Sequence, residues 1–287
     1  MEISSAFFIL IFLGLNLLFA DRIPSSQALL VKYVGLLLLI GLAKRTAERT
    51  EKRGWVLFRD FLPGLLVFEV YDGLGYMLHQ INPHDVDSVL IRIDSLLFET
   101  NLTLWMQQFV SPFLNDLMHL AYFSFYFLPI ILAILLWANG KNGAFHRFVL
   151  GATNAFYLCF LIYILLPAAG PRSTLAPLYS IPLEGSAITD FVRGFVASAE
   201  SLQWDCFPSG HTAVTLVVLW YALREERSAV YFFLPIASLL VISTVYCRYH
   251  YAIDLMAGVP VAVVSVLSAD WLEYKNLQYR NRNSIRP

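Results

Sequence analysis

The stretch RYHYAIDLMAGVPVAVVSVLSA, residues 248–269, joins three polar side chains to a long apolar run. A helix that crosses the hydrocarbon core of a bilayer needs roughly 20 mainly apolar residues. Asp254 carries the only charge between Tyr251 and Ala269. The stretch therefore predicts a membrane-spanning helix that has Arg248, His250 and Asp254 at its beginning.

Further apolar runs of similar length occur along the chain. Apolar residues make up 58% and charged residues 14% of the sequence, whereas soluble domains have about 45–50% and about 25%. We therefore predict an all-α polytopic membrane protein with about eight transmembrane helices. The spans are expected at about 5–20, 27–43, 60–78, 116–137, 148–166, 211–223, 229–246 and 251–269. A signal peptide is a weaker interpretation of the first run, because Glu2 replaces the usual basic segment and no cleavage site follows.

The distribution of Lys and Arg predicts the orientation. One set of connections holds Lys44, Arg45, Arg49, Lys52, Arg53, Arg59, Lys141, Arg147, Arg224, Arg227, Lys275, Arg280, Arg282 and Arg286. The opposite connections hold far fewer basic residues, and cytoplasmic loops are the ones enriched in Lys and Arg. Both termini are thus expected in the cytoplasm, and segments 167–210 and 247–250 in the periplasm, extracellular space or lumen. The expected location is the inner (plasma) membrane of a bacterium. Leu97–Val110 is expected to form a helix in the outer interface.

Three short segments at the outer ends of different spans carry the polar chemistry: PAAGPR (167–172), CFPSGHT (206–212) and RYHYAIDLMAG (248–258). His250 and Asp254 are four residues apart and share a helix face. A carboxylate there fixes the imidazole tautomer and leaves the other nitrogen free to attack. His211 is placed to protonate a departing oxygen.

The remaining residues of these segments fit the binding of a phosphate group. Ser209 and Gly210 precede a helix, where free N–H groups bind phosphate oxygens. Arg172 and Arg248 can neutralise phosphate charge, although an arginine at a span end is often only an interfacial anchor. Charged groups are costly inside a membrane, so their convergence favours function.

Two acids of the third span, Glu69 and Asp72, are three residues apart and share a helix face. We expect them to point into the bundle, near the active site or the headgroup. The alternative is a structural pair satisfied by Arg, Tyr or water.

At these motifs the sequence resembles the type 2 phosphatidic acid phosphatase superfamily, whose motifs read K-x6-R-P, P-S-G-H and S-R-x5-H-x3-D. Pro208-Ser209-Gly210-His211 matches the second motif, Ser243, His250 and Asp254 match the third, and Arg172 matches the first. The resemblance implies a phosphohistidine on His250, acid catalysis by His211, and neither a metal nor another cofactor. It also implies a six-helix catalytic core at 60–270, preceded by two helices with a basic loop (1–59) and followed by a basic tail (271–287).

Three positions depart from the motifs: Leu165 and Ser173 in the first, and Thr244 in the third. The loss of the lysine and the arginine is similar to the branch that contains inositol phosphorylceramide synthases and sphingomyelin synthases. Those enzymes move a phospho-headgroup between lipids. Arg248 is the candidate for the missing positive charge.

The sequence thus predicts a lipid-phosphate phosphatase or phosphotransferase. Its expected partners are a lipid phosphate or phospholipid substrate and the bilayer, without nucleic acid. The alternatives are an inositol phosphorylceramide synthase-like transferase and a catalytically silent lipid transporter or scaffold. Vanadate-dependent haloperoxidases share the constellation but are soluble. Cys206 and Cys247 lie near the two histidine motifs and are either packed thiols or a disulfide.

Overall fold

The computed structural model describes residues 1–50, 52–200 and 202–284, and this part of the chain is mainly helical. Helices make up 81% of the chain, and strands are absent from the described residues. The all-α prediction is therefore confirmed. The α-helices are α1 (Glu2–Leu18), α2 (Ser26–Thr50), α3 (Arg53–Ile81), α4 (Asp87–Phe98), α5 (Leu102–Trp105), α6 (Pro112–Phe123), α7 (Leu128–Ala138), α8 (Asn142–Leu165), α9 (Pro171–Thr174), α10 (Ala187–Ala199), α11 (Gly210–Glu225), α12 (Val230–Tyr246) and α13 (Ala252–Ser284). Short 3₁₀ turns are η1 (Met106–Phe109), η2 (Ser124–Tyr126), η3 (Ala176–Leu178) and η4 (Arg227–Ala229).

Several helices are long and apolar enough to cross a membrane. Among the described residues five meet this condition, and a sixth span arises if α6–η2 and α7, bent by 45°, are one broken helix. Helices occupy all eight predicted places, but α1 has 17 residues and α11 has 16. At 1.5 Å per residue these two fall short of the roughly 30 Å hydrocarbon core. The predicted count of eight spans and the six-helix core are not confirmed.

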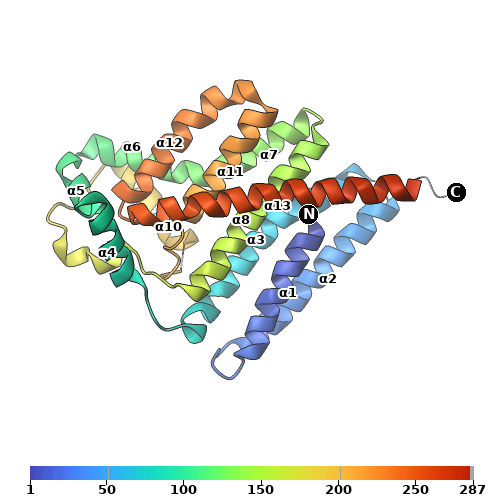
Figure 1. Cartoon of the computed structure of the whole chain (residues 1–287), viewed down its shortest axis with the longest axis horizontal. Coiled ribbons are helices and arrows are strands. Elements are labelled where there is room, and N and C mark those ends of the chain that lie inside the picture. Colours follow the sequence, from blue (N-terminus) through green and yellow to red (C-terminus); the bar gives the residue numbers. More distant parts are fainter. Residues whose placement is uncertain (51, 201, 285–287) are drawn as a thin grey trace.

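Helix α8 lies at the centre of the bundle. Its most apolar window is 72% buried, against 28% for α2, so α2 lies at the periphery. Figure 1 shows α1 and α2 (blue) as a pair to one side, and α4, α5, α6 and α10 gathered where α13 begins. The loops that carry the predicted chemistry lie in this second group.

Two segments differ from the predictions. The interfacial helix predicted at Leu97–Val110 is broken, because α4 ends at Phe98 and Glu99 adopts a left-handed conformation with φ 56°. The Asn101 side chain then accepts a hydrogen bond from Thr103 N and starts α5. The basic segment predicted as a tail continues α13 as far as Ser284, and residues 285–287, which include Arg286, lie outside the described residues.

Helices α11 and α13 approach each other closely at Gly258. A Cβ atom at this position would lie 2.8 Å from the backbone oxygen of Ser209 and 3.1 Å from Cβ of Thr212. Backbone atoms cannot give way as a flexible side chain can, so the contact requires glycine. This contact places the beginning of α11 against the first turns of α13.

We expect Gly258→Ala to lower the free energy of unfolding by about 1–3 kcal/mol, the usual cost of overpacking. Gly64→Ala, in α3, is the matched control, since a Cβ atom there meets nothing within 4 Å and alanine favours helix. Thermal unfolding of the purified protein in detergent measures both changes. Equal midpoints for the two variants would contradict the close approach.

Candidate active site

Two imidazole rings meet at the end of the bundle where α11 and α13 begin. His211 belongs to the first turn of α11, and His250 lies in the turn between α12 and α13. His250 Nε2 is 3.4 Å from His211 Nδ1, and His250 Nδ1 is 3.3 Å from Asp254 Oδ2. The structure thus brings together the three side chains that the motifs single out.

Asp254 is fully buried and holds His250 in a defined orientation. Its Oδ2 accepts hydrogen bonds from Tyr251 N (2.8 Å) and from the Cys206 thiol (2.9 Å). An ionised carboxylate is only an acceptor, so the proton of His250 lies on Nδ1 when the two interact. The lone pair of His250 is then on Nε2, which faces His211.

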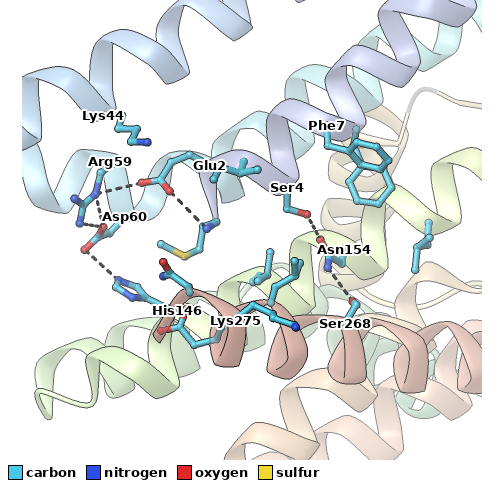
Figure 2. Close-up of a pocket in the computed structure, with 18 of the residues that line it drawn as sticks. Glu2, Ser4, Phe7, Lys44, Arg59, Asp60, His146, Asn154, Ser268 and Lys275 are labelled. Atoms are coloured by element: carbon cyan, nitrogen blue, oxygen red, sulfur yellow. Dashed lines mark hydrogen bonds and ion pairs between the residues drawn. The ribbon is translucent and has the colours of Figure 1, made fainter. Parts of the chain in front are cut away.

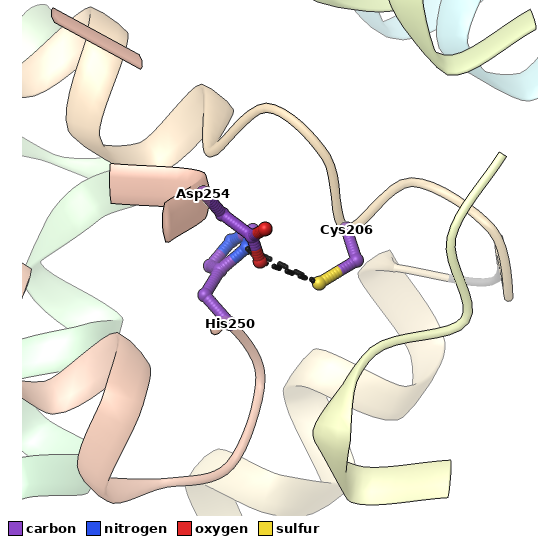
Figure 3. A group of neighbouring side chains, drawn as sticks. All are labelled: Cys206, His250 and Asp254. Carbon is purple, nitrogen blue, oxygen red and sulfur yellow. Dashed lines mark hydrogen bonds and ion pairs between the residues drawn. The ribbon is translucent and has the colours of Figure 1, made fainter. Parts of the chain in front are cut away.

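Cys206, His250 and Asp254 form a compact cluster (Figure 3). Their ligand atoms lie within 4.8 Å of one another, which is close enough to hold a metal ion. Thiolate, imidazole and carboxylate are also ligands of Zn²⁺. In this structure the Cys206 thiol donates to Asp254 Oδ2 at 2.9 Å, and a metal ion held by the three residues would require the loss of this thiol proton.

A second carboxylate, Glu200, lies beside His211, and the sequence motifs do not indicate it. Glu200 Oε1 is 3.4 Å from His211 Nε2, although this nitrogen has no aligned hydrogen bond. The hydroxyl groups of Tyr122 and Tyr126 donate to Glu200 at 2.7 and 2.5 Å. Burial alone would raise the pKa of Glu200, but His211 and the two tyrosines together hold it below its ordinary value. Each histidine thus has its own carboxylate.

Aromatic rings hold His211 in place. The ring centroids of Phe125 and Tyr122 lie 4.2 and 4.6 Å from that of His211. Tyr122 also stacks on Tyr249, the residue before His250, with centroids 4.5 Å apart. These contacts hold the ring of His211 and connect it to the motif segment that carries His250.

Two aspartates of α4 anchor the loops around the site. Asp87 accepts from the backbone N–H groups of Ala169 and Gly170, both at 2.8 Å. Asp94 accepts from Ala252 N (3.0 Å) and Ile253 N (2.8 Å), and so caps the start of α13. Burial raises the pKa of Asp94. Their seven-residue spacing on one helix is a signal that sequence reasoning could have used.

Ser209 and Gly210 occupy the start of α11, as the motif suggests. The Ser209 side chain accepts from Thr212 N and caps the helix. Its backbone N–H donates to the carbonyl oxygen of Asp254 at 3.0 Å. A Cβ atom at Gly210 would lie 2.8 Å from Tyr163 Oη. The cap takes up the N–H of Thr212, so the N–H groups before it in the first turn of α11 are the candidate donors for an anion.

The two arginines do not contact the histidines. Arg248 is buried, donates to the carbonyl oxygen of Ile181 at 2.6 Å, and lies 3.8 Å from the centroid of the Tyr179 ring. Arg172 is exposed and donates to Tyr249 Oη at 3.2 Å. Arg172 is therefore connected to the site through Tyr249, whereas Arg248 holds the loop at 179–181.

Glu69, Asp72 and Cys247 lie apart from the histidine pair, whereas Cys206 Sγ lies 3.6 Å from His250 Nδ1. Glu69 and Asp72 both pair with Lys32 of α2, at 3.0 and 2.7 Å, and neither has a hydrogen bond or ion pair to the candidate catalytic side chains. Cys206 and Cys247 are free thiols. Cys247 Sγ lies 3.8 Å from His119 Nδ1, which leaves the two cysteines in separate surroundings.

A large cavity, of about 960 Å³, lies elsewhere (Figure 2). It is lined by the first half of α8 and the second half of α13, whereas the histidine site lies at the other ends of these helices. Several of its charged groups pair with one another: Arg59 pairs with Glu2 and Asp60, and Asp60 lies 3.8 Å from His146 Nε2. None of the candidate catalytic residues lines this cavity, so its size does not make it the active site.

The fold and the site define an α-helical protein with membrane-length apolar helices and a buried pair of histidine–carboxylate contacts. The model of the PAP2 superfamily matches residues 89–268, and the chain belongs to this superfamily. A PA-phosphatase related-family protein of Dictyostelium discoideum is 27% identical over 180 residues, which cover 55% of this chain and 32% of that relative. The match thus spans about a third of the relative's length. No solved structure matches the chain. These findings support a phosphatase-type enzyme in a membrane.

Replacing Asp94 by alanine removes both acceptors from the first N–H groups of α13. We expect Asp94→Ala to lower the free energy of unfolding by about 1–3 kcal/mol, the combined effect of a lost cap and unpaired donors. Asp190→Ala, at an exposed position in the first turn of α10, should change it by less than about 0.5 kcal/mol. Denaturation followed by circular dichroism compares the variants, and an unchanged stability of Asp94→Ala would refute the anchoring role.

Proposed function

We propose that this chain is an integral membrane lipid-phosphate phosphatase or phosphotransferase that works through a phosphohistidine on His250. The observation that carries the proposal is the paired arrangement of the site. Asp254 lies against Nδ1 of His250, Glu200 lies against Nε2 of His211, and the two remaining nitrogens face each other at 3.4 Å. Once the two nitrogens move apart to admit a phosphate ester, the phosphorus atom meets a nucleophile on one side and its leaving oxygen meets an acid on the other.

The first step transfers the phosphoryl group to the enzyme. The lone pair of His250 Nε2 attacks phosphorus, the ester P–O bond breaks, and the departing oxygen takes the proton from His211 Nδ1. Asp254 stabilises the positive charge that develops on His250. Glu200 stabilises the protonated form of His211 before the transfer, since an anion favours a nearby imidazolium.

The second step releases the phosphoryl group. A water molecule or an alcohol gives its proton to His211 Nδ1 and attacks phosphorus, and the P–N bond breaks. With water the product is inorganic phosphate, and with a lipid alcohol it is a new phosphate ester. The same residues serve both outcomes, so the acceptor alone separates a phosphatase from a phosphotransferase.

The phosphate oxygens require positive charge and N–H donors. We assign Arg172, Ser209 and Gly210 to phosphate binding, with the donors at the beginning of α11. Arg248 belongs to this set only if its guanidinium leaves the Ile181 carbonyl oxygen when substrate binds. We propose that no metal or other cofactor takes part. The site is proposed to open to the extracytoplasmic side, with both termini in the cytoplasm, because the basic residues gather at the other helix ends.

A second candidate is transfer of a phospho-headgroup between lipids, as in inositol phosphorylceramide synthases. It is favoured by Leu165, Ser173 and Thr244, which replace motif residues at three positions. A silent transporter or scaffold is disfavoured because His211, His250 and Asp254 are all retained. Incubating the protein with a panel of lipid phosphates and phospholipids, with and without alcohol acceptors, and identifying products by mass spectrometry separates these functions.

We expect a radiolabelled phosphate ester to leave an acid-labile label on the wild-type protein and none on His250→Ala. The reason is that the P–N bond of a phosphohistidine hydrolyses at low pH. His250 is the proposed nucleophile, because its free Nε2 faces His211, the proposed general acid. Turnover should be lost in His250→Ala and should fall to a low remaining level in Asp254→Asn. Labelling in the presence of a chelator tests metal independence in the same experiment.

His84→Ala is the matched control, since His84 is exposed in the connection between α3 and α4. This variant should incorporate the radiolabel and hydrolyse the phosphate ester as the wild-type protein does. Full activity in His250→Ala would rule out the mechanism, and loss of labelling in chelator that zinc or magnesium restores would rule out its metal independence.

We expect His211→Ala to slow the hydrolysis of alkyl phosphates by about 10²–10⁴-fold, the usual contribution of general acid catalysis. Nitrophenyl phosphate should be affected much less, because nitrophenolate departs without protonation. Glu200→Gln should show the same pattern with a smaller loss. Rates of the two substrates with each variant measure this, and equal losses for both leaving groups would argue against the acid role.

A further inference from the structure

Three potential ligand atoms for a metal ion converge behind the candidate nucleophile. Cys206 Sγ and Asp254 Oδ2 both lie near Nδ1 of His250, the ring nitrogen that faces away from His211 (Figure 3). Cys206 belongs to the segment between α10 and α11, His250 to the turn between α12 and α13, and Asp254 to the first turn of α13. The cluster therefore lies where two connecting segments meet, at the end of the helix bundle.

The distances within the cluster resemble those of a zinc site. Zinc binds sulfur at about 2.3 Å and nitrogen or oxygen at about 2.0–2.2 Å, so tetrahedral angles place its ligand atoms roughly 3.3–3.6 Å apart. Cys206 Sγ is 3.6 Å from His250 Nδ1, which is 3.3 Å from Asp254 Oδ2. The third distance, 2.9 Å between Sγ and Oδ2, is that of the thiol hydrogen bond and has to lengthen when the thiol loses its proton. Two of the three separations thus suit zinc without any rearrangement.

The charges of such a complex balance as well. A thiolate and a carboxylate together carry two negative charges and a neutral imidazole carries none, so Zn²⁺ makes the complex neutral. This matters because all three side chains are buried, and a net charge in a buried position is costly. Asp254 Oδ1 is buried without a hydrogen-bond partner and is available as a fourth ligand. The N–H of Tyr251, which donates to Oδ2 at 2.8 Å, orients the carboxylate.

We propose that Cys206, His250 and Asp254 form an inhibitory site for Zn²⁺. The ion replaces the proton of the Cys206 thiol, which is released to solvent, and binds the lone pair of His250 Nδ1, so that the ring proton moves from Nδ1 to Nε2. A neutral imidazole has a free lone pair on only one of its nitrogens. With zinc on Nδ1, Nε2 therefore carries a proton and cannot attack phosphorus. This blockade, unlike the metal site itself, rests on the proposed function.

The set of ligands selects among metal ions. Thiolate and imidazole suit Zn²⁺, whereas Mg²⁺ prefers oxygen ligands in octahedral geometry and keeps several water molecules. We therefore expect micromolar zinc to inhibit the wild-type protein and a chelator to restore its activity. Magnesium at the same concentration should have no effect, which separates a site with a thiolate from a general effect of divalent cations on the phosphate ester.

Binding is tested directly with Co²⁺, a spectroscopic substitute for zinc, on purified protein without an affinity tag. A bond between cobalt and a thiolate gives a charge-transfer absorption band in the near ultraviolet. We expect the wild-type protein to show this band, saturating at one ion per chain, and zinc to remove it. Cys206→Ser keeps a hydroxyl donor for Asp254 but has no thiolate, and it should lack the band.

Cys247→Ser is the matched control. Cys247 is also a buried free thiol beside an imidazole, 3.8 Å from His119 Nδ1, but it belongs to no group of three potential ligands within the described residues. This variant should keep the cobalt band. Cys206→Ala is the second variant, in case Cys206→Ser fails to fold. Absence of the band from the wild-type protein would overturn the proposal whatever the variants show.

The blockade is tested by the radiolabelled phosphohistidine and by hydrolysis of a phosphate ester. Zinc should lower the label on the wild-type protein to the level of His250→Ala. Each variant is compared with its own rate in the absence of zinc, since Cys206→Ser removes a donor to Asp254 and changes turnover by itself. The zinc concentration for half inhibition should rise by about tenfold or more in Cys206→Ser and stay unchanged in Cys247→Ser. Equal half-inhibitory concentrations in Cys206→Ser and the wild type would contradict the proposal.

The two measurements separate this proposal from the proposed function. A cobalt band that depends on Cys206, in a protein that hydrolyses no phosphate ester, would keep the metal site and refute the catalytic function. Turnover that zinc does not lower, in a protein without the band, would keep the catalytic function and refute the metal site.

Discussion

The structure around the candidate site depends on one constraint: the carboxylate of Asp254 has no contact with solvent. Such a group must be surrounded by donors, since an unpaired buried charge is among the most costly features of a protein. The donors to its Oδ2 come from two segments: the Cys206 thiol from one, and the backbone N–H of Tyr251 and the ring of His250 from the other. The backbone of Asp254 also accepts from Ser209 N. Satisfying this single residue therefore joins the two histidine motifs.

The same constraint explains why acidic side chains hold the outer loops. Loop N–H groups buried among helices have no neighbouring strand or helix turn to pair with, so side chains must accept from them. Asp87 satisfies two such groups in the loop that precedes α9, and Asp94 satisfies two at the start of α13. Both belong to α4, which therefore acts as a rigid support for two of the three motif segments.

Sequence reasoning found the parts of the site that depend on local spacing. The four-residue spacing of His250 and Asp254 follows from helix geometry, and the apolar runs predict where the helices lie. Glu200 was missed because it lies at the end of α10, ten residues before α11 and outside the motifs, and only the tertiary fold places it beside His211. The number of membrane spans could not be predicted from the apolar pattern either. Hydropathy does not reveal that α6 and α7 meet at a 45° bend or that α11 has only 16 residues. Arg248 has the residue type expected for phosphate binding, yet its side chain points to the loop at 179–181, which spacing alone does not predict.

The two histidine–carboxylate contacts differ in a way that suits their proposed roles. Asp254 is fully buried and interacts with a backbone N–H and a thiol, which fixes the ring of the nucleophile in one orientation. Glu200 is held by two tyrosine hydroxyls, which satisfy its oxygens without cancelling its charge. The negative charge of Glu200 therefore remains available to stabilise a protonated His211. Replacing one of these tyrosines by lysine or arginine would satisfy Glu200 equally well, but it would neutralise the negative charge on which a protonated His211 depends.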